Sequence, residues 1–142
     1  MLPTEVRVGY IFRYSYLWHR QHLEGHEEGD KDRPCLVLAS IKAEDGSSAV
    51  RVLPITHTPP DDPATAIEIP RLVKERLRLD YERSWIVLTE SNRFVWPGPD
   101  LRPVHSDTGY YGPIPPALFA EVKRRFVALA RGQSHTSVWR TE

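Results

Sequence analysis

The chain has 142 residues, of which 40% are apolar, and it carries 19 basic and 19 acidic side chains. This length suits one domain with its own core, and the apolar share excludes a disordered chain. The formal net charge of zero excludes a molecule that attracts nucleic acid or membrane with its whole surface, so any anion-binding site must be local.

The single cysteine and the N-terminal residues indicate the cellular compartment of the protein. Cys35 cannot form an internal disulfide, which fits a reducing environment, and its place in an apolar run predicts a buried, unreactive thiol. Residues 1–7 show no basic region followed by an apolar stretch, and no apolar run reaches membrane-spanning length. We therefore expect a cytoplasmic protein.

The first half of the chain predicts one strand followed by an antiparallel hairpin. Residues 6–12 are rich in strand formers and give the first strand. A polar connection follows over residues 14–31, and connections of this length are usually functional or mobile. Residues 34–40 form a nearly continuous apolar strand, and residues 49–55 form its return strand after a turn at residues 44–48.

The second half predicts short strands and one helix. The helix covers residues 116–131, with proline at its entry and Gly132 at its end. Before it, residues 72–79 are charged and give no clear pattern, whereas residues 133–142 are expected to form a frayed C-terminal tail. The expected short strands are residues 66–69, 84–89 and 93–96. The apolar stripe of the helix, expected to be largely buried, comprises Phe119, Val122, Phe126 and Leu129.

Several short strands with one terminal helix predict a mainly β fold. We expect a small barrel with a strongly bent antiparallel sheet, in a single domain over residues 1–132 that the tail follows.

Arg33 and Thr56 lie at two strand ends that the hairpin brings together. Pro34 lacks a backbone N–H and has a fixed φ, so it favours the first position of a strand and leaves Arg33 at the rim. A guanidinium can stabilise the charge that builds on a phosphate, and a hydroxyl can donate to a phosphate oxygen. The pair therefore predicts a compact phosphate site, with a surface arginine and a turn threonine as the plain alternative.

The order of these motifs resembles one family of bacterial toxins. The stretch Lys31-Asp32-Arg33-Pro34 opens an apolar strand, and the return strand ends in Pro54-Ile55-Thr56. A strand with Gly9 and an acidic loop precede this unit, and Ser84-Trp85-Ile86-Val87 and residues 109–112 follow it before the helix. Over about residues 6–129 the chain resembles the PemK/MazF family of endoribonucleases from toxin–antitoxin systems.

The resemblance implies an SH3-like barrel of the PemK type that acts as a homodimer. Such enzymes cut single-stranded RNA without a metal or another cofactor, and an antitoxin protein holds them in check. The 2′-hydroxyl attacks the adjacent phosphate and leaves a cyclic phosphate and a 5′-hydroxyl. The catalytic arginine and threonine of the family fall on Arg33 and Thr56. The chain differs from the family in its histidine-rich first loop, an enlarged segment over residues 59–83 and a proline-rich segment over residues 92–106.

Three histidines are candidates to assist in proton transfer. His57 follows Thr56 and could supply the transfer that an arginine performs badly, provided that the strand has ended before it. His22 and His26 of the long connection are the other two candidates.

Three further residues are candidates for binding the RNA. Lys31 lies close to the site arginine in sequence, and Tyr16 and Trp18 offer rings on which bases can stack. Aromatic residues occupy every second position from Tyr10 to Trp18, and a core or a dimer face is the alternative for this set.

The histidine-rich connection also raises the question of a metal site. The candidate ligands are His19, His22 and His26 with Glu27, and the spacing of three and four would align the histidines on one face of a helix. Glycines interrupt the segment, so a solvated loop is preferred. Two rival functions follow: a metal-dependent hydrolase that uses these histidines, and a non-catalytic binding module that resembles the gyrase poison CcdB and acts on a protein target.

Overall fold

The structure is a computed structural model, and it describes residues 1–26, 29 and 31–140. Its central element is the hairpin of β2 (Arg33–Lys42) and β3 (Ser48–Thr56), as predicted. At its tip the Asp45 carboxylate accepts hydrogen bonds from the backbone N–H and the hydroxyl of Ser47 at 2.9 and 2.7 Å. A register shift between Val37 and Ala39 marks a bulge, which increases the bend of the hairpin.

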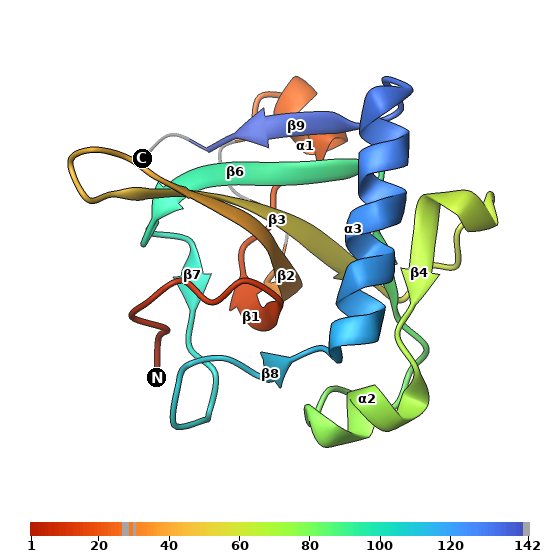
Figure 1. The fold of residues 1–142 in the computed structure, drawn as a ribbon, viewed down its shortest axis with the longest axis horizontal. Helices are drawn as coiled ribbons and strands as arrows, with labels where there is room; N and C mark the ends of the chain where they lie inside the picture. Colours follow the sequence, from red (N-terminus) through yellow and green to blue (C-terminus); the bar gives the residue numbers. More distant parts are fainter. Residues whose placement is uncertain (27–28, 30, 141–142) are drawn as a thin grey trace.

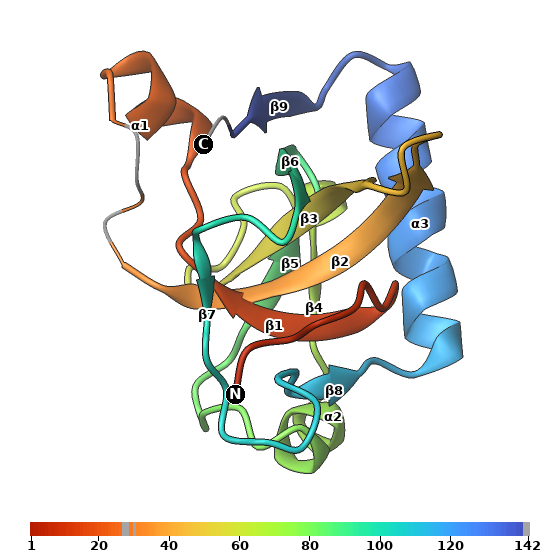
Figure 2. The ribbon, with the colours of Figure 1, turned by 90° about the vertical axis from the view of Figure 1, so that its left-hand side faces the viewer.

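The other strands extend this hairpin into one bent sheet (Figure 1, Figure 2). The main path of the sheet runs β4-β5-β3-β2-β1-β7, while β6 pairs with β3, and β8 pairs with β1. All these pairs are antiparallel. The strands are β1 (Tyr10–Tyr14), β4 (Ala66–Glu68), β5 (Trp85–Val87), β6 (Glu90–Trp96), β7 (Leu101–Arg102) and β8 (Gly112–Pro113).

The mainly β fold with a bent antiparallel sheet and a terminal helix is confirmed, but the sheet is not closed into a barrel. The reason lies in β3, which pairs with β6 along its first half and with β5 at its end. The sheet therefore splits at β3, and the β5 branch ends at β4 while the other edge ends at β7.

Two hydrophobic clusters lie on opposite faces of the sheet, because successive strand residues point to opposite sides. Helix α3 (Pro116–Arg131) covers the aliphatic face, as Figures 1 and 2 show. Val122 is fully buried there, whereas the other three residues of the predicted stripe are half-buried against the same cluster. The other face holds an aromatic cluster that includes Phe12, Tyr14, Tyr16, Phe94, Trp96 and Tyr110. Cys35 is buried in this cluster, as expected, and burial raises the pKa of its thiol.

The prediction of a frayed C-terminal tail is wrong. Residues Thr136–Trp139 form β9, which pairs in parallel with β6. Arg140 follows it and is buried, with its guanidinium 2.8 Å from the Asp100 carboxylate and from the backbone oxygen of Ser15. These contacts fix the end of the chain to segments distant in sequence.

Other boundaries also differ from the prediction. The first strand begins at Tyr10, because the Tyr10 N–H turns back to the Arg7 carbonyl and Gly9 adopts a left-handed φ of 88°. Helix α2 (Arg71–Arg76) overlaps residues 72–79, for which the sequence gave no clear pattern. The connection over residues 14–31 contains α1 (His19–Leu23). A short 3-10 helix, Pro63–Thr65, leads into β4. Within the described part of the chain, no helix has the length and apolar character needed to cross a bilayer.

Candidate active site

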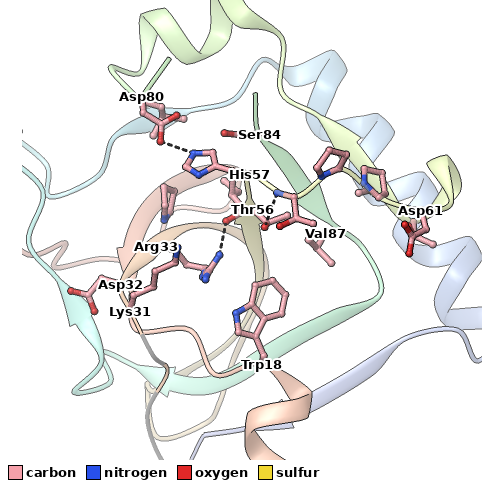
Figure 3. A pocket seen from close by; sticks show the side chains of 18 of the residues that line it. Trp18, Lys31, Asp32, Arg33, Thr56, His57, Asp61, Asp80, Ser84 and Val87 are labelled. Carbon is pink, nitrogen blue, oxygen red and sulfur yellow. Dashed lines mark hydrogen bonds and ion pairs between the residues drawn. The ribbon is translucent and has the colours of Figure 1, made fainter. Parts of the chain in front are cut away.

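An open cavity of about 670 Å³ lies where β2 begins and β3 ends (Figure 3). Arg33 lines it from the first position of β2, and Thr56 lines it from the last position of β3. The pairing of Cys35 with Pro54, continued by two residues, places Arg33 opposite Thr56. The two residues therefore meet at one concave site, as their positions at the strand ends predict. Their catalytic roles stay predictions.

Two contacts with described residues hold the Arg33 guanidinium against the wall of the cavity. Its Nη1 donates a hydrogen bond to the backbone oxygen of Ile55 at 3.3 Å. Its Cζ lies 4.8 Å from the centroid of the Trp18 ring, within the range of a cation–π contact. The half-buried side chain is thus oriented before any ligand arrives.

The side chain of Thr56 takes part in the turn that follows β3. Its Oγ1 accepts a hydrogen bond from the backbone N–H of Thr58 at 3.2 Å, which is a local turn typical of threonine. This bond uses a lone pair of the oxygen, so the hydroxyl proton can be donated to a ligand. Because the strand ends here, the next side chain, His57, also lines the cavity.

His57 is linked to a nearly buried lysine through a carboxylate. Its Nε2 lies 2.7 Å from Asp80 Oδ2, and its Nδ1 lies 3.4 Å from Glu82 Oε2. The other oxygen of Asp80 accepts from Lys74 Nζ at 2.7 Å, and Lys74 also donates to the Ser84 hydroxyl. Burial acts to raise the pKa of Asp80, but the hydrogen bonds from Lys74 and His57 outweigh it and hold this pKa below its ordinary value.

The three predicted RNA-binding residues have different environments. Lys31 is exposed and lines the cavity, and Trp18 is half-buried and lines it beside Arg33. Tyr16 is fully buried, its hydroxyl donates to Glu90 at 3.1 Å, and burial raises its pKa well above the ordinary value. Its proposed role in base stacking does not agree with this burial, because strand alternation continues past β1 and turns the ring into the aromatic cluster.

The histidines of the long connection lie outside this cavity. His22 and His26 are exposed, and His26 Nε2 is 3.8 Å from Glu24. Among the residues with described positions, no cluster of His, Cys, Asp and Glu side chains could hold a metal ion. Glu27, the predicted fourth ligand, lies outside the described residues.

Lys74 and Asp80 were not predicted as site residues. They lie in and after α2, within the segment over residues 59–83 that looks enlarged in the sequence. One signal was present: Lys74 occurs between Val73 and Leu77, both on the buried side of α2. A lysine at such a position needs an anionic partner, which the sequence alone does not identify.

The cavity wall carries charges of both signs, and the acids are largely compensated. Asp80 is paired with Lys74, and Asp32 forms ion pairs with Arg13 at 3.7 Å and Arg102 at 3.3 Å. The charged residues of the wall, apart from His57, are Arg20, Lys31, Arg33, Asp32, Asp61 and Asp80. Comparison with protein-family models, with curated proteins and with solved structures finds no match for the chain. The arrangement combines a fixed cation, a hydroxyl donor and an imidazole at one open cavity, which are groups suited to phosphoryl transfer.

Proposed function

We propose that this protein is an endoribonuclease that cleaves single-stranded RNA without a metal. The observation that supports it most is the shared cavity of Arg33 and Thr56, at the adjoining ends of two paired strands. The substrate supplies the nucleophile, its own 2′-hydroxyl. The protein therefore needs only to orient one phosphate, stabilise the charge that develops on it and move protons.

Each part of this task has a candidate residue in the cavity. The guanidinium of Arg33 stabilises the negative charge of the transition state, because it stays protonated at any working pH and is held in place beforehand. Thr56 donates its hydroxyl to a phosphate oxygen. Lys31 attracts the RNA backbone, and the Trp18 ring at the edge of the cavity can stack on a base.

The proposed setting follows from the resemblance described above. In it the protein is a cytoplasmic toxin that acts as a homodimer and is restrained by an antitoxin protein. Because the cavity is open, we expect an extended single strand to enter it. In a double helix the bases pair with each other, so they are not available to the protein in the same way.

The test uses a long unstructured RNA in the presence of EDTA. We expect cleavage by the wild-type protein and a loss of about 100-fold or more in Arg33→Ala, the scale of removing one charge-stabilising donor. Arg33→Lys should also cleave poorly, because a point charge does not reproduce the planar fork of donors.

Arg124→Ala is the matched control, because Arg124 is exposed on α3 and paired with Glu121 outside the cavity. It should cleave at the wild-type rate. Full activity in Arg33→Ala, or cleavage that stops on addition of EDTA, would contradict the proposal. Tight RNA binding with no cleavage would favour a binding module instead.

A further inference from the structure

A chain of three titratable side chains leads from the interior to the cavity. Lys74 on α2 has only 6% of its side chain exposed, and its ammonium contacts Asp80, the Ser84 hydroxyl and the backbone oxygen of Glu82. Asp80 then contacts the His57 ring at 2.7 Å. A buried ammonium is unfavourable unless it is paired, and here its ion pair fixes the carboxylate that faces the imidazole.

These contacts determine which ring nitrogen of His57 can accept a proton. When the ring is neutral, Nε2 carries the hydrogen, because it lies within hydrogen-bonding distance of Asp80 Oδ2. The lone pair is then on Nδ1. The neighbour of Nδ1 is the Glu82 carboxylate at 3.4 Å, whose side chain is 74% exposed.

We propose that His57 is the general base of the RNA cleavage reaction, and that Asp80, fixed by Lys74, is its positioning residue. This inference rests on the proposed function. Nδ1 takes the proton of the 2′-hydroxyl while the 2′-oxygen forms its bond to phosphorus. The bond from phosphorus to the 5′-oxygen breaks, and the leaving oxygen takes a proton from solvent water, which reaches the open cavity. His57 afterwards releases its proton to solvent.

Several charges bear on the His57 ring. Asp80 and Glu82 contact it directly. The other charged residues that line the cavity are the cations Arg33, Lys31 and Arg20 and the acids Asp32 and Asp61. In the described part of the chain no lysine contacts the Glu82 carboxylate, whereas Lys74 holds Asp80, so Glu82 does not fix the orientation of the ring.

This difference gives two variants with different expected effects. In Glu82→Gln the rate at high pH should stay within about twofold of the wild type, because Glu82 does not set the tautomer of the ring. In Asp80→Asn the rate at high pH should fall about tenfold or more, because the amide oxygen can accept from Lys74 while its NH2, a donor, faces Nε2 and no longer sets the tautomer. His57→Gln should lower the rate about 100-fold at all pH values.

Glu75→Gln is the control for these variants. Glu75 is paired with Arg71 on the exposed side of α2, next to Lys74 in sequence, and its replacement should leave the profile unchanged. A thermal melt of each variant shows whether the loss of Asp80, the partner of a buried lysine, has unfolded the protein.

A second measurement does not depend on activity. Two-bond ¹H–¹⁵N NMR spectra at pH 8.5, with the signals assigned by their absence in His57→Gln, should show His57 with hydrogen on Nε2. Hydrogen on Nδ1 would overturn the proposal even if the variants lose activity.

The outcomes separate this inference from the proposed function. Cleavage that needs Arg33 but survives in His57→Gln would overturn the role of His57 and leave the endoribonuclease in place. Absence of cleavage by the wild-type protein would overturn both.

Discussion

The ring of His135 has different hydrogen-bond partners from the ring of His57. Its Nδ1 lies 2.7 Å from the Leu88 carbonyl and must carry a hydrogen, so its Nε2 accepts from the Ser91 hydroxyl at 2.8 Å. Ser91 in turn accepts from Arg51 at 2.7 Å. Burial lowers the pKa of His135, and the nearby Arg51 lowers it further against the opposing effect of the Leu88 bond. The ring is therefore a neutral structural link, whereas the exposed ring of His57 faces carboxylates.

The lowered pKa of His135 predicts a loss of stability in acid. The folded state disfavours the protonated ring, so the stabilisation is complete above the unfolded pKa of about 6.5 and declines as the pH falls below it. We expect the free energy of unfolding, measured in urea from pH 8 to pH 5, to fall more steeply for the wild type than for His135→Gln. His105→Gln, at an exposed position, should follow the wild type. Parallel curves for the wild type and His135→Gln would contradict this assignment.

Among the elements, those that local sequence determines were predicted well. The hairpin of β2 and β3 follows from two apolar runs around a turn with Gly46, and α3 follows from its apolar stripe between Pro116 and Gly132. Strand β9 was not predicted, because four residues are too few to show the alternation of apolar and polar residues that indicates a strand. Its partner β6 also lies more than 40 residues earlier in the chain. A short parallel pairing of this kind depends on tertiary packing, which local propensity does not report.

The assignment of β9 as part of the core can be tested at Val138. This side chain has only 2% of its surface exposed. Val138→Asn would bury an amide in its place, and we expect a loss of about 2 kcal/mol or more in the free energy of unfolding. Thr136→Asn, on the same strand but exposed, should stay within about 0.5 kcal/mol of the wild type. If both variants are equally stable in urea melts, β9 is not part of the core and the segment is a frayed tail.

Over the whole molecule, the candidate site combines what the sequence shows with what only the fold reveals. Arg33 and Thr56 could be placed together because one hairpin connects them. Asp80 could not, because its position opposite His57 depends on a contact between the segment after α2 and the residue after β3. That the sheet stays open could not be predicted for a similar reason, since its split at β3 is a property of long-range pairing. The net charge of zero agrees with a local anion site, where Asp80 and Asp32 are paired with neighbouring cations.

We propose that an RNA 2′-hydroxyl is the nucleophile at the Arg33 cavity, and the ends of the RNA fragments show whether it is. Wild-type protein and Arg33→Ala are incubated with the same single-stranded RNA in EDTA, and the products are identified by mass spectrometry. We expect the wild-type protein to give fragments with 2′,3′-cyclic phosphate and 5′-hydroxyl ends, and Arg33→Ala to give almost none. Fragments with 3′-hydroxyl and 5′-phosphate ends, or equal amounts of product from both proteins, would contradict this proposal.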